Sequence, residues 1–422
     1  MLLRTGLIAL SLAIITVLFY WYNYSQIAGA TNTYAMYQDI HVMTFVGVGF
    51  LCAFLKRNSN TAIASALFLA AFSVLWGTIN FPFWRRNLNQ SLTNTWSMSE
   101  RFNVCITNLA QADFCAFAVL ISFGAVVGRA STTQLFVMAF VEVIAYSINE
   151  AINNEVFFVA DFGGSMTIHL FGALFGIAAS FFLEFRPSRK YHAEQDKAPE
   201  VTQDSNTLAM IGTLFLFCFF PSFNAFATSS LSLVVQQRAV INTVLAICAS
   251  VVATFALSPL CNQGRFMMRE VQGATLAGGI AMGAPAATVT NLYGAVIIGM
   301  VAGACATLAH AFLEPVLAKK LTVRDTASVL SFFGVPGLVG GIASVVLAGA
   351  STRDNYLAEG TALNLVYRGA ATRDAFTLAW NQFAVFGVSI GIAVLVGSLT
   401  GLLMTALEDL DTFFDDSVEY HA

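Results

Sequence analysis

Residues 161–173 of this chain read Asp161-Phe162-Gly163-Gly164-Ser165-Met166-Thr167-Ile168-His169-Leu170-Phe171-Gly172-Ala173, and the apolar run continues to about Phe182. A run of this length spans a lipid bilayer as a helix. A charged side chain at the bilayer centre costs about 3 kcal/mol, so ionisable residues inside a span are candidates for function. Asp161 stands at one end of the run, whereas His169 lies further in and avoids most of this cost by staying neutral. The stretch predicts a membrane helix that carries a functional site. The alternative is a histidine hydrogen-bonded between helices, without a transport role.

The composition extends this prediction to the whole chain. Of its 422 residues, 57% are hydrophobic and only 10% are charged, and the mean hydropathy is +0.72. A soluble chain carries charge on roughly a quarter of its residues. We therefore expect an all-α polytopic membrane protein that lies in a lipid bilayer and has no nucleic acid partner. The seven cysteines form no CxxC pair, so the sequence predicts no metal site, no disulfide framework and no cofactor.

Apolar segments of spanning length define the topology. The first begins after Arg4 and ends in the aromatic cluster Phe19-Tyr20-Trp21-Tyr22, which is typical of a membrane interface and unlike the small residues of a signal cleavage site. It is therefore predicted to be a retained helix. The segment at 271–285 is short and rich in Gly and Ala. Together they predict about 12 spans, at 5–22, 39–55, 61–79, 108–127, 133–152, 162–183, 206–225, 239–259, 271–285, 290–312, 327–349 and 378–406.

Basic residues predict the orientation. With the N-terminus inside, the inner connections contain 13 of the 20 Lys and Arg residues, which favours cytoplasmic locations for both termini. The longest inner connection, about 185–205, is polar. Two N-x-S triplets, beginning at Asn23 and Asn89, then fall in outer connections. Both asparagines are candidate glycosylation acceptors.

Small residues and prolines mark places where helices approach closely or break. Glycines allow helix backbones to approach each other in lipid, and prolines in or beside spans often mark breaks that line a cavity. The glycines are Gly278, Gly279, Gly283, Gly294, Gly299, Gly303, Gly334, Gly337, Gly340 and Gly341, and the prolines are Pro221, Pro285 and Pro336.

An internal repeat points to a pore. His169 follows Asp161 by eight positions, and Phe333 follows Asp325 by eight positions. Asp161 opens its span at the outer end and Asp325 opens its own at the inner end, as an inverted repeat requires. The repeat predicts that the two rings face one axis at mid-depth, on antiparallel helices. Such an apolar axis suits a small neutral molecule and opposes an ion, because an unpaired cation in it costs several kcal/mol. A weak base could be recruited as a cation and cross after losing a proton.

Several blocks of the chain resemble the Rh glycoprotein branch of the ammonium transporter (Amt/Mep/Rh) superfamily. Among them are Ala112-Asp113-Phe114, Pro221-Ser222-Phe223-Asn224 and Gly334-Val335-Pro336-Gly337. Taken in order along the chain, the blocks are residues 37–47, 112–114, 120–126, 163–169, 221–224, 238–243, 274–279, 293–299, 334–341 and 414–417. The resemblance thus covers nearly the whole chain.

The resemblance implies an architecture. It implies an 11-helix inverted-repeat core plus an extra N-terminal helix, and one pore in each subunit of a homotrimer. On this basis residues 1–36 form the extra helix and an outer loop, residues 37–407 form the transporter domain, and residues 408–422 form a cytoplasmic tail. The expected location is the plasma membrane.

The resemblance also implies roles for individual residues. Glu150 resembles the acidic residue that attracts ammonium at the outer vestibule, and Asp161 resembles the buried aspartate that keeps this region in shape. Phe114 and Phe223 resemble the two phenylalanines that gate the pore. His169 resembles the first of a pair of pore histidines. Asp325 is the pseudo-symmetric partner of Asp161.

The chain departs from the family pattern at two positions. The family usually has His-Gly-Ile-Pro-Gly where this chain has Phe333-Gly334-Val335-Pro336-Gly337, so Phe333 replaces the second pore histidine. Gly273 stands where the family commonly has asparagine. The first departure removes a hydrogen-bond partner of His169 and puts a bulky ring at mid-pore.

The leading hypothesis is passive transport of ammonia or ammonium, mainly as neutral NH3. The alternatives are a non-conducting Rh-like subunit, acting as scaffold or sensor or forming a heterotrimer with an Rh paralogue, and a CO2 channel. An enzyme is not expected, because His41 and His310 have no acid or nucleophile at motif spacing; both are predicted to be structural.

Overall fold

The computed structural model describes residues 2–24, 33–94, 101–185, 200–321, 323–353, 356, 363–368, 370–407, 409–410 and 412–418. Within these residues, nine helices are long and apolar enough to cross a membrane. Their regular cores are α4 (Ser59–Thr93), α5 (Ile106–Val126), α6 (Thr132–Ile152), α7 (Phe171–Leu183), α9 (Gln203–Ala225), α10 (Leu233–Cys261), α13 (Leu292–Leu308), α15 (Val335–Gly349) and α18 (Ala375–Thr405).

The remaining predicted spans are short or broken. The first is α1 (Leu2–Leu18), extended by a 3-10 turn. The second is divided into α2 (Tyr34–Val42), the π-helical η2 (Met43–Val48) and α3 (Gly49–Leu51). The predicted span at 271–285 is divided into α11 (Met268–Gly273), the 3-10 turn η6 (Ala274–Leu276) and α12 (Ala277–Met282). With these three, the structure confirms an all-helical membrane architecture of about 12 spans.

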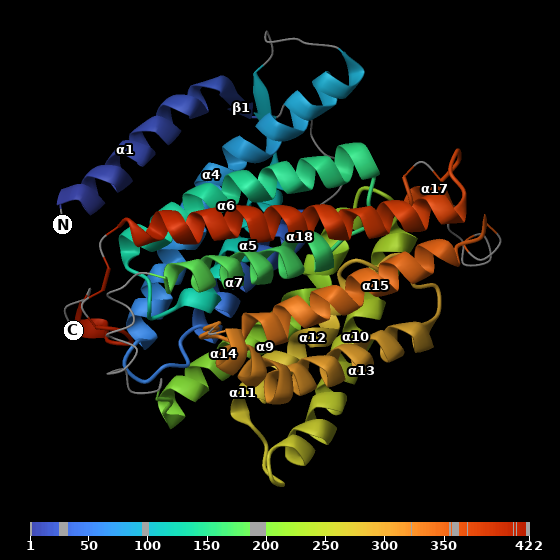
Figure 1. Ribbon diagram of the computed structural model, residues 1–422. Coiled ribbons are helices and arrows are strands. Elements are labelled where there is room, and N and C mark those ends of the chain that lie inside the picture. Colours follow the sequence, from blue (N-terminus) through green and yellow to red (C-terminus); the bar gives the residue numbers. More distant parts are fainter. Residues whose placement is uncertain are drawn as a thin grey trace.

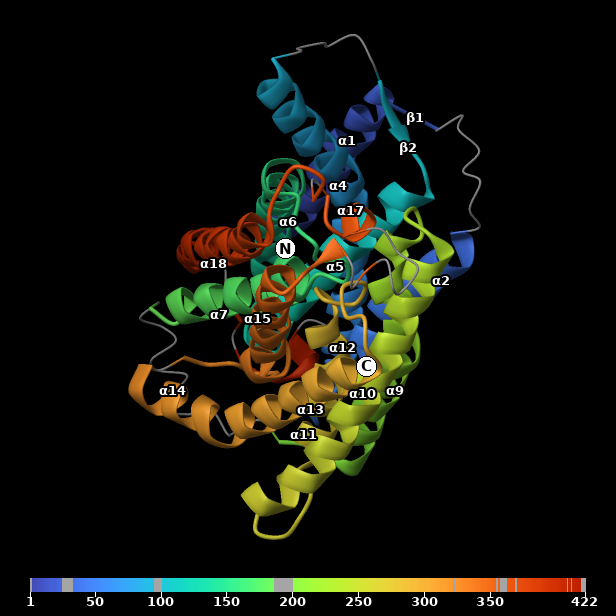
Figure 2. The same ribbon diagram turned by 90° about the vertical axis from the view of Figure 1, so that its right-hand side faces the viewer.

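The spans form one bundle whose two ends differ. Helices α6, α18, α7 and α15 run side by side (Figure 1), and the view along them shows α10, α13 and α9 packed on the other side of the bundle (Figure 2). The two ends of the chain lie at the same end of the bundle (Figure 1), as an even number of crossings requires. We call this the terminal end, and the other the far end.

Glycines bring three helices into backbone contact, as their spacing predicts. A Cβ added to Gly278 of α12 would lie 2.0 Å from the carbonyl oxygen of Ala246 in α10. A Cβ added to Gly299 of α13 would lie 2.1 Å from the same oxygen. Neither position can hold a larger residue without separating the helices, so the small side chains determine the packing distance.

A two-stranded parallel ribbon, which the sequence did not predict, lies at the far end. Strand β1 (Tyr22–Tyr24) pairs with β2 (Phe102–Val104). The ring of Tyr22 stacks on Phe102 with centroids 4.9 Å apart, and its hydroxyl donates to the Ile79 carbonyl at 2.7 Å. Tyr20 and Trp21 remain 66% and 58% exposed, as side chains at a membrane interface are. The ribbon ties the first helix to the start of α5.

The C-terminal tail is attached to the terminal end. The Asp416 carboxylate accepts hydrogen bonds from the backbone N–H groups of Thr61 (2.8 Å) and Asn60 (3.3 Å) in the first turn of α4. The Phe414 N–H donates to the Gly128 carbonyl at 2.9 Å. An anionic group at a helix N-terminus is favourable because the free N–H groups there carry partial positive charge.

Parts of two predictions lie outside the described residues. Residues 186–199 of the polar connection at 185–205 are outside them, as is Ser25 of the first N-x-S triplet. The basic residues of that connection therefore remain part of a sequence-based prediction of orientation.

Candidate functional site

The stretch from Asp161 to His169 forms a capped π-helical turn. Asp161 Oδ2 accepts hydrogen bonds from the Met166 N–H (3.2 Å), the Thr167 N–H (2.9 Å) and the Thr167 hydroxyl (2.8 Å). Between them, Gly164 adopts a left-handed conformation with φ of 67°, which costs glycine little. The turn η4 (Ser165–Leu170) then continues into α7. The cap orients this segment so that His169 is fully buried.

The stretch from Asp325 to Phe333 repeats this construction. Asp325 Oδ1 accepts from the Val329 N–H and Oδ2 from the Leu330 N–H, both at 2.9 Å. Ser328, at the position that corresponds to Gly164, is also left-handed with φ of 56°. The π-helical turn η8 (Leu330–Gly334) continues into α15. Phe333 is 5% exposed.

The rings of the two residues that lie eight positions after the aspartates, His169 and Phe333, stack against each other. The rings of His169 and Phe333 are nearly parallel, at 19°, with centroids 6.1 Å apart. The inverted repeat therefore brings together two residues that are separated by 164 positions, and the packing of η4 against η8 and α15 supports the arrangement.

Further aromatic rings enclose His169. Phe117 lies edge-on at 5.4 Å, and Phe220 and Phe223 lie at 5.9 and 5.8 Å. Phe223 also contacts Phe114, edge to face at 4.6 Å. The ring of Phe226 lies 6.1 Å from that of Phe114. We call His169 and the six phenylalanines around it the aromatic column; the phenylalanines are Phe114, Phe117, Phe220, Phe223, Phe226 and Phe333. The structure thus places the two predicted gate residues against each other, and Phe223 also lies next to the histidine.

Sequence reasoning missed three members of this column, namely Phe117, Phe220 and Phe226. A signal was present, because Phe114 and Phe117 are three residues apart, and so are Phe220, Phe223 and Phe226. Residues with this spacing share one face of a helix. A high phenylalanine content alone predicts no contact between particular rings. Two spans that each have a face of phenylalanines do predict that these faces contact each other.

The polar atoms of His169 have an unusual environment. Its side chain is fully buried, and neither ring nitrogen has a hydrogen-bond partner within the described residues. Leaving a buried donor or acceptor unsatisfied costs about 1–3 kcal/mol. The column therefore contains one polar group that is available to a small polar molecule.

A small hollow continues beyond Phe333. It measures about 20 Å³ and lies between Phe332, Phe333, Val329 and the apolar side chains of α3 and α5. A volume of this size holds about one water-sized molecule. The ring of Phe333 therefore contacts the histidine on one side and lines this small hollow on the other.

Glu150 lies near a charged network at the far end. Its Oε1 accepts a hydrogen bond from the Asn154 side-chain amide, and Glu150 is within electrostatic range of Arg85 and Glu155. Arg85 Nε donates to Glu155 Oε1 at 2.6 Å, and Asn89 Nδ2 donates to Glu155 Oε2 at 3.0 Å. The sequence did not predict the Arg85–Glu155 pair. Asn89, a candidate glycosylation acceptor, lies within α4 and its amide is engaged in this network.

His41 and His310 each face a carboxylate. His41 Nδ1 lies 3.0 Å from Asp113 Oδ2, and His310 Nδ1 lies 3.2 Å from Glu270 Oε1. The acids are 72 and 40 residues away in sequence, so a search at motif spacing could not find them. Asp113 directly precedes Phe114, one of the two predicted gate residues.

Gly273 makes room for the ring next to Phe333. A Cβ at this position would lie 2.2 Å from Phe332, and Phe332 stacks on His310 with centroids 5.1 Å apart. The asparagine that the family commonly has here does not fit beside Phe332 in this position. The two departures from the family pattern therefore lie close together in the structure.

Comparison with known proteins places this geometry in a family. The model of the Ammonium Transporter Family matches residues 1–413. The chain belongs to the ammonium transporter family. The resemblance predicted from the sequence is confirmed.

Relatives and solved structures of this family agree. Mouse (Mus musculus) ammonium transporter Rh type A is 39% identical over 374 residues, which are 88% of this chain and 76% of that protein. Zebrafish (Danio rerio) ammonium transporter Rh type B is 36% identical and covers 91% of this chain and 81% of its own. The structure of Nitrosomonas europaea Rh50 is 26% identical, with a TM-score of 0.73, over 92% of this chain and 91% of that chain. Saccharomyces cerevisiae Mep2, at 17% identity and a TM-score of 0.68 over 88% and 84% of the two chains, shares the fold.

Proposed function

We propose that this member of the ammonium transporter family conducts ammonia and ammonium passively across the membrane through the aromatic column. Glu150 recruits the cation at the far end, and Phe114 and Phe223 remove its water. The molecule then passes His169 and Phe333 mainly as neutral NH3. The proposal assigns the chain transport and no catalysed reaction.

The observation that carries the proposal is the state of His169. Its imidazole has no hydrogen-bond partner among the described residues and is enclosed by four rings, those of Phe117, Phe220, Phe223 and Phe333, so a neutral imidazole here offers one hydrogen bond to a passing molecule. Ammonia can use that bond. A cation would lose its hydration without a facing carboxylate, at a cost of several kcal/mol. Asp161 and Asp325 act indirectly, by holding the two turns that present the rings.

A liposome assay tests this function. Protein reconstituted under an inward ammonium gradient should change the internal pH faster than empty liposomes, and His169→Ala should alter that rate. His192→Ala, in the polar connection of the sequence, is the matched control and should leave the rate unchanged. Equal rates in protein-containing and empty liposomes, with insertion verified, would refute the proposal.

The second candidate function is a non-conducting Rh-like subunit that acts as scaffold or sensor, and the stacking of Phe333 on His169 favours it. Phe333→His would give His169 a hydrogen-bond partner, whereas Phe333→Leu would remove the ring without adding a polar group. If the parent is silent and only Phe333→His conducts, the second candidate is correct. If the parent conducts, it is excluded. The same liposomes under a CO2 gradient, read by acidification, test the CO2 alternative.

We further propose a homotrimer in the plasma membrane, with both termini and the tail 408–422 in the cytoplasm. The extra N-terminal region would comprise residues 1–36 and the transporter domain residues 37–407. The common end of the two termini supports an even number of crossings (Figure 1). The mass of the purified particle distinguishes a trimer from a monomer. Co-purification with an Rh paralogue would instead indicate a heterotrimer. Glycosidase treatment tests Asn23 and Asn89 as acceptors.

A further inference from the structure

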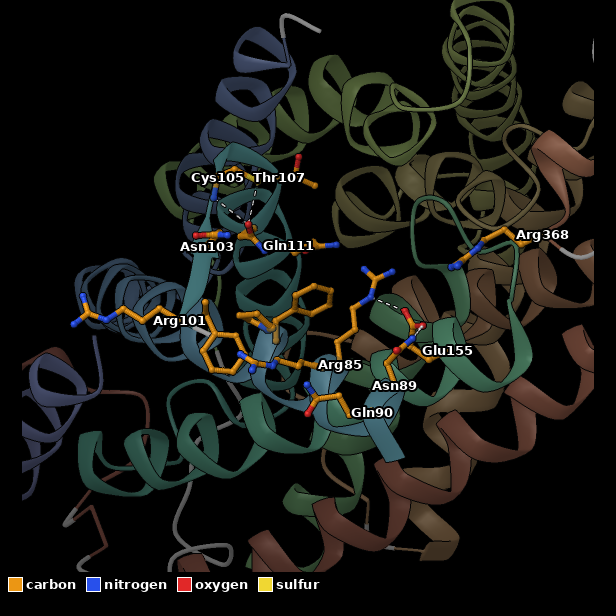
Figure 3. A pocket seen from close by; sticks show the side chains of 15 residues that line it. Arg85, Asn89, Gln90, Arg101, Asn103, Cys105, Thr107, Gln111, Glu155 and Arg368 are labelled. Atoms are coloured by element: carbon orange, nitrogen blue, oxygen red, sulfur yellow. Dashed lines mark hydrogen bonds and ion pairs between the residues drawn. The ribbon is translucent and has the colours of Figure 1, made fainter. Parts of the chain in front are cut away.

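A wide cavity lies beside the last part of α4. The 35 residues of α4 give a length of about 52 Å, about 20 Å more than the hydrocarbon core of a membrane. The polar last part of α4 lines a cavity of about 950 Å³ together with β2, the start of α5, Glu155 and Arg368 (Figure 3). Its position and its polar lining make this cavity accessible from water.

The charged residues that line the cavity are mainly of one sign. Among the described residues they are four arginines and one glutamate, Arg85, Arg86, Arg101, Arg368 and Glu155. Side-chain amides, including those of Asn89, Asn103 and Gln111, add hydrogen-bond donors. Guanidinium groups match the planar oxygens of carboxylates and phosphates in pairs of hydrogen bonds.

Glu155 shows how an oxyanion is held here. Arg85 and Arg368 extend toward the space beside its carboxylate from two sides (Figure 3). The carboxylate accepts hydrogen bonds from Arg85 and Asn89 and lies within electrostatic range of Arg368. It therefore occupies one oxyanion position, while the cavity extends well beyond it.

Arg368 is available for a further anion. Its guanidinium lies 5.0 Å above the ring of Phe158, and the side chain is exposed. Stacking on an aromatic face fixes the guanidinium plane and leaves its N–H groups free at the edge. No carboxylate within the described residues lies within 4.0 Å of it as an ion-pair partner.

We propose that this arginine-lined cavity binds a multiply charged oxyanion, a phosphate or carboxylate compound, between Arg85 and Arg368. The ligand competes with Glu155 for Arg85. The cavity volume accommodates an ion larger than inorganic phosphate, and the three excess positive charges of the lining favour a ligand with at least two negative charges. Neither Arg85 nor Arg368 has a role of its own in the proposed passage of ammonia.

Calorimetric titration of the full-length protein with pyrophosphate tests the proposal. In nanodiscs of phosphatidylcholine at low salt, saturable binding with a Kd below about 1 mM is expected, weakening as salt screens the charges. Arg368→Gln and Arg85→Gln should each weaken it about tenfold, which corresponds to the loss of about one hydrogen bond to a charged group. Glu155→Gln should tighten it. Arg353→Gln, which changes an exposed arginine outside the cavity, is the matched control and should have no effect.

A second arm identifies the source of the oxyanion. If phosphatidylglycerol in the nanodisc displaces pyrophosphate, the natural occupant is a lipid headgroup; if it does not, the occupant is a soluble anion. Either result supports the proposal. The proposal would be overturned if the protein showed no saturable binding although it was folded, as judged by the same thermal transition in nanodiscs before and after the titration. Equal weakening by Arg353→Gln would overturn it as well, because the binding would then be a general effect of surface charge.

Discussion

The two capped turns share a framework and differ in what they present. In each, an aspartate accepts backbone hydrogen bonds, the third residue after it is left-handed, and the eighth carries a ring at mid-column. One ring is a histidine whose nitrogens have no hydrogen-bond partner in the described part of the chain, and the other is a phenylalanine. The framework therefore determines where the rings lie, whereas a single side chain in each half determines the chemistry.

The caps also differ in their surroundings. Asp161 receives an additional bond from the Thr167 hydroxyl, whereas the second turn is joined to Glu314 by bonds from Ser328 (3.0 Å) and Ser331 (3.1 Å). The first turn is joined to the α12 segment instead, because the Ser165 hydroxyl donates to the Ile280 carbonyl at 2.7 Å and accepts from the Ala284 N–H at 2.6 Å. Each turn is therefore held by its own aspartate and by a different neighbouring segment.

The largest expected effect comes from removing the first cap. Asp161→Ala leaves buried N–H groups without acceptors and should lower the free energy of unfolding by about 4 kcal/mol. Asp325→Ala removes two bonds and should cost about 2 kcal/mol. Thermal unfolding in detergent measures both. Equal losses would show that the additional Thr167 bond contributes nothing to the difference.

The next effect is expected at Gly273, which lies against Phe332, the residue before Phe333. Gly273→Asn places a side chain against Phe332 and should destabilise the protein by about 3 kcal/mol, as overpacking of a core does. The double variant with Phe332→Ala should recover part of that loss, because the obstructing ring is gone. Thermal unfolding of the three variants gives the coupling. Strict additivity would contradict the proposed contact.

A smaller effect separates the two left-handed positions. Gly164→Ala introduces a Cβ at a left-handed residue, and also within 2.3 Å of Ile168, so it should cost about 2 kcal/mol. Ser328 already tolerates this conformation, and Ser328→Ala should cost about 1 kcal/mol through its lost bond to Glu314. If Gly164→Ala proves neutral, the left-handed turn is not essential to the first half.

A pH dependence of stability is also expected in the second half. Burial, and then the nearby Glu314 carboxylate, raise the pKa of Asp325, which lies between two spans, to about 7. Its folded state binds the proton more tightly than the unfolded state does, so the stability it contributes is present below pH 4 and is lost as the pH rises toward 7. The melting temperature of the parent relative to Asp325→Asn should therefore fall over this range and stay level above it. A constant difference would argue against the shift.

The sequence predicted the parts of this molecule that local pattern determines. The spans follow from apolar runs, and the Asp161 and Asp325 turns from a repeat whose spacing is visible in one dimension. The contact between Phe114 and Phe223 was expected only through the family resemblance. The enclosure of His169 could not be predicted, because the rings around it come from three separate segments, α5, α9 and η8. The same holds for Arg85 with Glu155 and for His41 with Asp113, whose partners are distant in sequence. The ribbon of β1 and β2 was not predicted, because strands of three residues are too short to show a periodic pattern of apolar residues.

The two π-helical turns have a consequence for how such a chain can change over time. Each ring stands at a fixed count of eight residues from its aspartate. Deleting one residue inside the count would turn every later side chain by about 100° around the helix axis and shift it by about 1.5 Å. The ring would then point into a neighbouring helix. Exchanging histidine for phenylalanine leaves this count intact. The aromatic column can therefore change through point substitutions, whereas an insertion or deletion between the aspartate and the ring would disrupt it.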